Sequence, residues 1–318
     1  ELQMLMNTLN LCNNRSQTGI NTDKSEISSR SGSRPPIFYG DTLLPHTDNI
    51  THIGLKRPLK TPNADVFDKI NIARRCLYGM IPTGLHGTNG VPPCVSRKVL
   101  VMHIMPRLLS GLQAVIPSTD DIKRITVFFN TTLKRLLSLR ESCSNAAAYL
   151  MIGLMPIEAF MDISVLQMFG AVGRLKHDHP IHLTAKRQLS IPERSKGWYT
   201  RALDIAHKYN IRDIAIQVLY GDISKANWKN TVTRAVNSKW YHEIMDKCMS
   251  SSSLEYLDLT KIQWGKAHFM WPVKAESRLR TAAAYRAKLI TGTYILQVHN
   301  VKFNLQTSPL CPLCGTEA

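Results

Sequence analysis

The sequence predicts a mainly α-helical protein with a small β-hairpin or meander near its N-terminus, an α+β arrangement in which the strands precede most of the helices. Two patterns support this fold class. Apolar residues recur at helical spacing from Val66 onwards, as at Ile70 and Leu77. Before that point, the runs 37–44 and 51–56 are short, rich in β-forming residues and bounded by turn residues, as antiparallel strands are.

The first 58 residues combine these strands with one helix. Residues 2–11 form the end of an amphipathic helix, which Asn13, Asn14 and Gly19 terminate. The segment 25–36 is polar, with Ser-Gly-Ser at its centre, and we expect a loop there.

The remaining elements are helices with one apolar face. Ser118 is placed to cap its helix, because Asp120 and Asp121 follow in the first turn, where the helix dipole favours acids. In the helix that opens near Ser96, His103 faces inward with the apolar residues and Pro106 introduces a kink. The expected helices cover residues 63–80, the stretch opening near residue 96, and residues 118–136, 145–155, 156–173, 198–209, 222–247 and 278–288.

These changes of pattern divide the chain into four regions, 1–58, 59–175, 176–249 and 250–318. The clearest boundary is the basic, histidine-rich joint 176–192, and the serine run 250–253 marks the next one. The segment 176–192 contains three imidazoles and a carboxylate within six positions, at His177, Asp178, His179 and His182. One interpretation of this cluster is a metal-binding site. We favour the other reading, a polar interdomain loop, because Pro180 and a joint of this kind do not preorganise ligands.

The charge balance indicates a polyanionic partner. Lys and Arg number 40 against 23 Asp and Glu, so the formal net charge is +17 and the isoelectric point is near 9.7. Nucleic acid fits this excess better than an anionic membrane surface does. No apolar run approaches the roughly 20 residues that a bilayer span requires. We therefore expect no membrane partner and an intracellular protein.

The seven cysteines are unlike a secreted disulfide framework, because they are odd in number and mostly lie in apolar contexts. The exception is the pair Cys311 and Cys314, whose spacing directs two thiolates at one tetrahedral zinc ion. This is half of a Zn²⁺ site, since four-coordinate zinc needs two further ligands. The alternative is a pair of free thiols.

Basic residues on the polar faces of the helices are candidates for contact with phosphates without reading bases. On the first helix of the body they lie opposite the apolar line of Ile70 and Leu77. The candidates are Lys69, Arg74, Arg75, Arg97, Lys98, Lys123, Arg124, Arg278, Arg280, Arg286 and Lys288.

Four segments, in their order along the chain, carry a resemblance to a known family. They are residues 20–57, then Ala73-Arg74-Arg75-Cys76-Leu77-Tyr78, then residues 105–112, and finally residues 284–294. In this order the chain resembles the C-terminal part of the non-LTR (LINE-type) retrotransposon reverse transcriptases. The resemblance implies the end of a polymerase palm, a helical thumb, a basic helical region, and an Arg-rich helix followed by the opening of a zinc knuckle.

The resemblance also implies roles for residues in the first region. Lys24 matches a lysine that faces the pyrophosphate leaving group and can act as a general acid. Thr51, His52, Ile53, Gly54 and Leu55 match the element that grips the end of the primer strand. A short strand ending in Gly lets the backbone approach phosphate closely.

The metal-binding aspartates of such a polymerase are not visible in this sequence. Two-metal chemistry needs carboxylates that hold Mg²⁺ ions about 3.5–4 Å apart, and the family places adjacent aspartates upstream of the first helix. Asp41 stands alone in a turn, and Asp120 and Asp121 are explained by the helix start. We therefore expect the Mg²⁺ ligands of the complete polymerase to lie outside this chain, and the chain alone to be inactive.

The partners implied are an RNA template, a DNA primer or target and, in the complete enzyme, a deoxynucleoside triphosphate, with a nuclear location. The alternative function is a nonenzymatic basic helical protein that binds RNA or DNA and derives from such an element. A third reading is a protein-interaction bundle whose charge is incidental.

Overall fold

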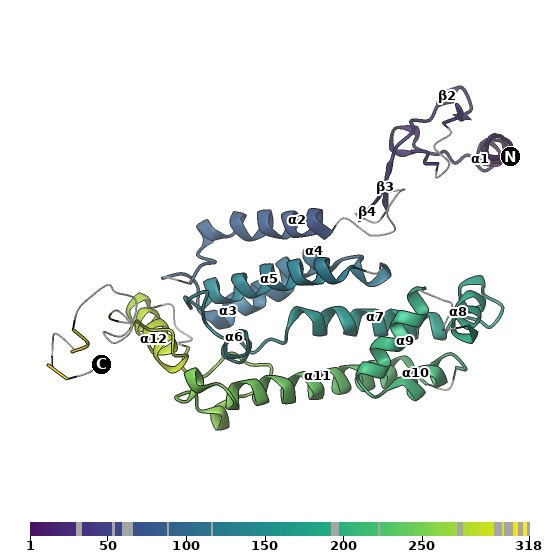
Figure 1. The fold of residues 1–318 in the computed structure, drawn as a ribbon. Coiled ribbons are helices and arrows are strands. Elements are labelled where there is room, and N and C mark those ends of the chain that lie inside the picture. The colour runs from purple at the N-terminus through teal and green to yellow at the C-terminus, as the bar shows by residue number, and fades with distance from the viewer. Residues whose placement is uncertain are drawn as a thin grey trace.

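The computed structural model describes residues 1–29, 34–52, 55–58, 66–87, 89–115, 117–191, 197–221, 223–271, 276–295, 301, 308–310 and 314–316. Its described residues are mainly helical, with small antiparallel hairpins near the N-terminus, which confirms the predicted fold class. Figure 1 shows a layered helical body from which the N-terminal elements project.

The N-terminal elements are α1 (Leu2–Ser16), β1 (Phe38–Tyr39), β2 (Thr42–Leu43), β3 (Asn49–His52) and β4 (Leu55–Pro58). β1 pairs with β2 and β3 pairs with β4, so the described strands form two separate hairpins rather than one meander. Gly40 takes a positive φ of 57° in the first turn, a conformation that costs glycine little. The side chain of Gln3 fixes α1 to β1 by accepting from the Phe38 amide at 2.8 Å and donating to its carbonyl at 3.0 Å.

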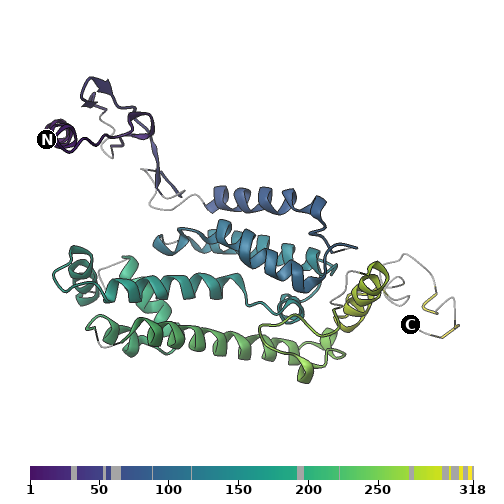
Figure 2. The same ribbon diagram turned by 180° about the vertical axis from the view of Figure 1, so that it is seen from behind.

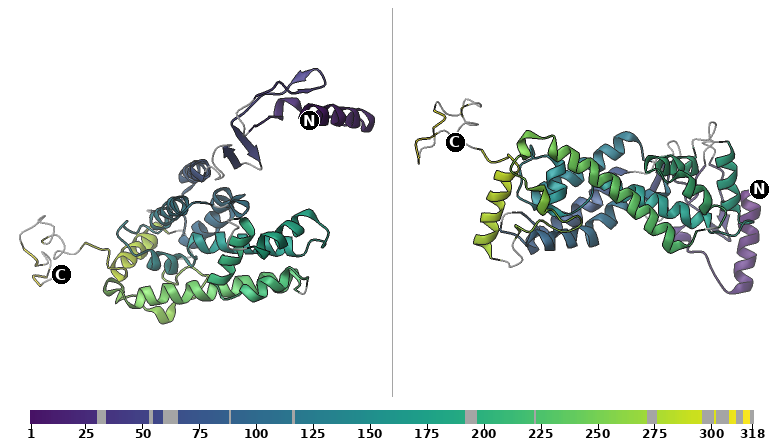
Figure 3. Two further views of the ribbon diagram at one scale, coloured as in Figure 1. Left: turned by 45° about the vertical axis from the view of Figure 1, so that its right-hand side comes forward. Right: turned by 90° about the horizontal axis from the view of Figure 1, so that it is seen from below.

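The body is built of helices that share apolar faces. Figure 1 and the view from behind in Figure 2 show α2, α5, α7 and α11 in successive layers, with α8, α9 and α10 at one end and α12 at the other. Seen from below in Figure 3, α12 lies across the end of α11. The helices are α2 (Val66–Gly79), α3 (Pro93–Val99), α4 (Met105–Leu109), α5 (Thr119–Leu136), α6 (Asn145–Ile152), α7 (Ile157–Gly173), α8 (Pro180–Ser190), α9 (Trp198–Lys208), α10 (Arg212–Val218), α11 (Lys225–Met249) and α12 (Ser277–Ile290).

Two hydrophobic clusters fill the body. The first joins α2 to α6 with the C-terminal end of α11 and with α12, and the second joins α7 to α10 with the first part of α11. α11 belongs to both, since Trp228 and Trp240 lie in the second cluster and Ile244 lies in the first. The first cluster therefore continues across the sequence boundaries at 175/176 and 249/250, and the second continues across 175/176. The division into domains stays a prediction.

The start of α5 is as the sequence predicts. The Asp121 amide donates to Ser118 Oγ at 3.1 Å, and the Ser118 amide donates to Asp121 Oδ2 at 3.3 Å. This reciprocal capping box satisfies amides that would otherwise lack partners at the helix end.

The stretch before α5 differs from the prediction. α3 begins at Pro93 rather than near Ser96, and the chain from Leu100 to Ile104 forms a π-helical turn before α4. Pro106 has no N–H to donate, and the helix widens just before it. The wider turn shifts the buried face to Leu100 and Ile104, so the prediction that His103 faces inward is wrong: its side chain is exposed.

The predicted interdomain loop 176–192 is also wrong over most of its length, because α8 occupies residues 180–190. Pro180 stands at the first position of this helix, where a missing N–H costs nothing. His179 caps it by accepting from the Ile181 amide at 3.2 Å. His182 is buried, and its Nε2 lies 3.4 Å from His177 Nδ1.

Within the described part of the chain, no single helix is long and apolar enough to cross a membrane. The bent pair α6 and α7 passes that test only when its two helices are counted together.

Candidate nucleic-acid interface

An open groove of about 860 Å³ runs between α2 and α5, which lie side by side in Figures 1 and 2. Its floor contains the apolar side chains Ile70 and Leu77 of α2 and Phe128 of α5. Residues at spacings of three, four and seven lie on one face of a helix, so each helix presents a continuous strip to the groove. The complete lining is Phe67, Ile70, Arg74, Leu77, Tyr78, Lys123, Arg124, Val127, Phe128, Thr131, Thr132 and Arg135.

The charged lining residues of this α2–α5 groove are all cations, namely Arg74, Lys123, Arg124 and Arg135, and no lining residue is acidic. At a rise of 1.5 Å per residue, Lys123 and Arg135 are about 18 Å apart along the axis of α5. The positive charge is therefore spread along the groove, as a chain of phosphates requires, and not gathered at one point.

Two of these cations have acidic neighbours outside the groove. Lys123 Nζ lies 3.7 Å from Asp120 Oδ1, and Arg135 Nη2 lies 3.9 Å from Glu141 Oε1. Both pairs are long and well exposed, so each holds its cation weakly. Arg74 and Arg124 are exposed and form no ion pair with any residue in the described ranges. These two arginines are the cations most available to a ligand.

The groove also exposes large apolar side chains beside its cations. Phe67 and Tyr78 of α2 and Val127 of α5 are all exposed although they line it. Aromatic rings interleaved with basic side chains are suited to the sugars and bases of nucleic acid as well as to its phosphates. Sequence reasoning missed these residues because an exposed aromatic residue and a core one look alike in a periodic pattern.

Lys69 corrects the predicted set of phosphate ligands. It is only 5% exposed, and its Nζ donates to Ser110 Oγ at 3.1 Å, between α2 and α4. Burial lowers the pKa of Lys69. Its position was readable in the sequence, because it follows Val66 by three residues and precedes Ala73 by four, which places it on the apolar stripe. Lys69 therefore does not face a ligand in the groove.

The other predicted cations lie outside the groove. Arg75 and Lys98 are exposed, whereas Arg97 is half-buried and its Nε donates to the Gly153 carbonyl at 3.2 Å. The α12 residues Arg278, Arg280, Arg286 and Lys288 lie at the far end of the body. Of these, Arg278 and Arg286 are exposed.

The catalytic and primer-grip candidates lie on the N-terminal elements. Lys24 is exposed at the end of a single 3₁₀ turn, Thr22–Lys24, and does not line the groove. Thr51 and His52 belong to β3 and Leu55 begins β4, while Ile53 and Gly54 lie outside the described residues. β4 ends at Pro58 and the next described element, α2, begins at Val66.

The metal candidates are not brought together among the described residues. No group of three or more His, Cys, Asp or Glu side chains able to hold an ion occurs there. Cys311 lies outside the described residues, and Cys314 Sγ lies 3.0 Å from Thr316 Oγ1. Asp41 stands exposed in the β1–β2 turn, and Asp121 is occupied in the capping box of α5.

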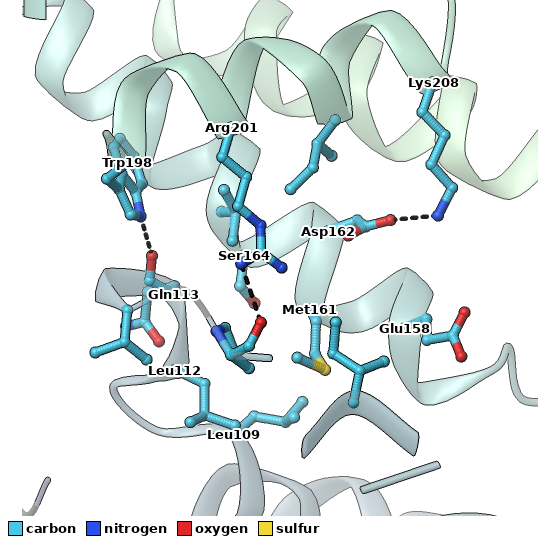
Figure 4. Close-up of a pocket in the computed structure, with 15 residues that line it drawn as sticks. Leu109, Leu112, Gln113, Glu158, Met161, Asp162, Ser164, Trp198, Arg201 and Lys208 are labelled. Carbon is cyan, nitrogen blue, oxygen red and sulfur yellow. Dashed lines mark hydrogen bonds and ion pairs between the residues drawn. The ribbon is translucent and has the colours of Figure 1, made fainter. Parts of the chain in front are cut away.

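A smaller, more enclosed cavity of about 100 Å³ lies between α7, α9 and the segment before α5 (Figure 4). Its polar groups already satisfy one another: Trp198 Nε1 donates to the Gln113 carbonyl at 2.6 Å, and Lys208 Nζ pairs with Asp162 at 2.9 Å. Arg201 Nη1 donates to the Pro117 carbonyl at 3.2 Å, and burial lowers the pKa of this guanidinium. We interpret this cavity as a structural contact, in which hydrogen bonds from Trp198 and Arg201 hold α9 against the segment before α5.

A scan against protein-family models, a search of curated proteins and a search of solved structures each found no match for this chain.

Proposed function

We propose that this chain holds nucleic acid in the α2–α5 groove and forms the thumb side of a non-LTR retrotransposon reverse transcriptase, an RNA-directed DNA polymerase. The observation that carries the proposal is a groove whose charged residues are all cations and whose apolar residues include exposed aromatic rings. The net charge of +17 supports the same class of partner.

The groove suits a backbone held without regard to sequence. Its cations are one guanidinium on α2 and three basic side chains along α5, all able to approach phosphates. The length of about 18 Å along α5 corresponds to roughly five steps of a duplex at 3.4 Å per step. Contacts of this kind position a duplex and carry little base information. A polymerase thumb that must follow a moving template and product duplex needs this property.

The rest of the proposal follows from the family resemblance. The 51–55 hairpin grips the primer end, Lys24 serves as the general acid at the pyrophosphate, and Cys311 with Cys314 supplies half of a Zn²⁺ site. In the resembled family, adjacent aspartates hold the Mg²⁺ ions, and the proposal assigns bond formation to such a pair outside this sequence. The partners are the RNA template, the DNA primer or target and the nucleotide of the complete enzyme, in the nucleus.

Binding to an RNA–DNA hybrid tests the groove directly. The full chain is titrated into a fluorescein-labelled hybrid, beside the variant Arg74→Glu/Arg124→Glu. A matched control, Lys229→Glu/Arg234→Glu, makes the same charge change at exposed positions of α11, away from the groove. We expect the groove variant to bind at least tenfold more weakly than the control. Equal losses in both variants would show that total charge, and not the groove, governs binding.

Templated primer extension separates the polymerase role from the alternative, a nonenzymatic nucleic-acid-binding protein. The chain is extended in both directions to include the segment that holds the aspartate pair, and is compared with Lys24→Ala and Asp41→Ala. The polymerase role requires extension that Lys24→Ala abolishes and Asp41→Ala leaves intact. Tight hybrid binding without extension favours the alternative, and weak binding with no salt dependence favours a protein-interaction bundle.

A further inference from the structure

A second group of exposed aromatic side chains lines a pocket that includes residues of α12. Figure 1 shows α12 at the end of the body opposite the N-terminal elements. Tyr256 is 76% exposed and Phe269 is 67% exposed, which makes them the most exposed aromatic residues of the described chain. Both line a pocket of about 210 Å³ that α12 closes with Arg286. We call this the C-terminal pocket. It shares no lining residue with the α2–α5 groove.

The backbone that carries these rings is anchored in the first hydrophobic cluster. Leu257, next to Tyr256, is buried. Beyond Phe269, the Trp271 indole is also buried, and its Nε1 donates to the Met151 carbonyl at 3.0 Å. The same carbonyl accepts from the His268 amide at 3.0 Å. Because their neighbours are fixed in this way, Tyr256 and Phe269 protrude from a supported surface, which lowers the entropy lost on binding.

His268 adds an unused hydrogen-bond donor to the pocket lining. The residue is only 7% exposed, and its ring lies against Phe269 with centroids 4.4 Å apart. Its Nδ1 accepts from the Met270 amide at 3.4 Å, which assigns the proton of the neutral ring to Nε2. Burial lowers the pKa of His268, so the ring is neutral near pH 7. Nε2 has no partner among the described residues, and a buried donor without a partner is costly.

The charges of the pocket leave one cation without an acidic partner. Asp258 pairs with Lys261 at 2.9 Å and also accepts from the amide and hydroxyl of Thr260, so Asp258 and Lys261 contribute no net charge. Arg286 is exposed and forms no ion pair within the described ranges. The pocket therefore combines aromatic faces, a neutral donor and an available guanidinium.

We propose that the C-terminal pocket binds single-stranded nucleic acid. Unpaired bases stack on Phe269 and Tyr256, a base acceptor receives the His268 Nε2–H, and Arg286 holds a phosphate. A duplex does not fit this role, because its base faces are covered by their neighbours in the stack. Stacking is tolerant of sequence, since every base has a π-face. The C-terminal pocket is separate from the α2–α5 groove, because the two sites use different residues and bind different forms of nucleic acid.

Fluorescence anisotropy of a short fluorescein-labelled oligothymidylate with the full chain tests this site. Stacking contributes about 1–3 kcal/mol per base, so Phe269→Leu and Tyr256→Leu should each weaken binding about 5- to 150-fold. The matched control is Tyr285→Leu, which removes an exposed tyrosine of α12 that does not line the pocket. We expect the control to bind within about twofold of the parent. Arg286→Gln should reduce the salt dependence by about 0.7 in log–log slope, the single-strand value for one phosphate.

Four outcomes would overturn the proposal. The first is binding unchanged by both Phe269→Leu and Tyr256→Leu, and the second is an equal loss in the Tyr285→Leu control. The third is competition by polyglutamate as strong as by unlabelled oligothymidylate, which would show a site that responds to charge alone. The fourth is equally strong competition by free thymidine monophosphate, which would show a mononucleotide site. Hybrid binding measured on the same variants keeps this test separate from the groove, since Phe269→Leu should leave it intact.

Discussion

Neutralising two arginines of the α2–α5 groove should change how binding of an RNA–DNA hybrid depends on salt, and not only how tight it is. The change is Arg74→Gln together with Arg124→Gln. These residues line the groove from facing helices and form no ion pair with described residues. Both substitutions keep a polar side chain at an exposed position, so the fold should persist.

The magnitude follows from the number of cations in the groove. If Arg74, Lys123, Arg124 and Arg135 each neutralise one phosphate, the logarithm of affinity falls with the logarithm of salt at a slope of about −3.6. Raising salt from about 50 to about 200 mM then weakens binding by about 150-fold. Without the two arginines the slope is about −1.8 and the same rise costs only about 12-fold. Lys123 and Arg135 remain, each with a weak acidic neighbour.

The assay is hybrid anisotropy measured with the full chain over a series of potassium chloride concentrations. The control is Lys229→Gln/Arg234→Gln on α11, which makes the same change of charge outside the groove. Two results would refute the reasoning: parallel lines for parent and groove variant, or a control whose slope falls as much as that of the groove variant.

Three further outcomes check other parts of the structure. Lys69→Met should leave hybrid affinity within about twofold of the parent, because Lys69 is buried away from the groove; a tenfold loss in the same titration would return it to the interface. Gly170→Ala should lower the free energy of unfolding by about 1–3 kcal/mol in urea, because a Cβ there would lie 2.2 Å from the buried Trp228 ring. Gly79→Ala is its control, since nothing lies within 4 Å of a Cβ at that position, and equal losses would contradict the packing. The third outcome concerns pH: since burial depresses the pKa of His268 below its ordinary 6.5, the unfolded chain binds the proton more readily. The contribution of His268 to the free energy of unfolding should therefore be fully present above about pH 6.5 and should decrease as the pH falls below that value. Urea unfolding at successive pH values measures this decrease, which should be smaller in His268→Gln.

Most helices could be predicted because their apolar spacing is strong. α2, α5 and α11 appear close to their expected places, and the Ser118 cap is where the sequence indicates. α8 was missed because the histidines and Pro180 resemble a loop, whereas proline is favoured at a helix start. The π-turn at Leu100–Ile104 was missed because periodicity assumes one constant rotation per residue.

The candidate site was only partly predictable, because the sequence identifies basic residues but does not show which of them are covered by neighbouring segments. Arg74, Lys123 and Arg124 were identified as cations on exposed helix faces, and they do line the groove. Lys69 was identified in the same way, yet it is buried with its Nζ donating to Ser110 Oγ at 3.1 Å. Lys134 of α5 is also buried, with its Nζ donating to the Glu141 carbonyl at 2.8 Å. Residue type gives the charge, but whether that charge meets solvent or a carbonyl depends on the neighbouring segments.

Helical periodicity and the basic excess establish that this is a helical, cationic chain, because both are local or additive properties that need no partner in space. Packing alone determines that α2 lies beside α5, with Phe67 and Tyr78 exposed between their cations. Packing also brings Phe269 and Arg286 to one pocket from separate segments. A groove is a relation between two surfaces, and it exists only once the hydrophobic clusters have set which faces are covered and which remain open.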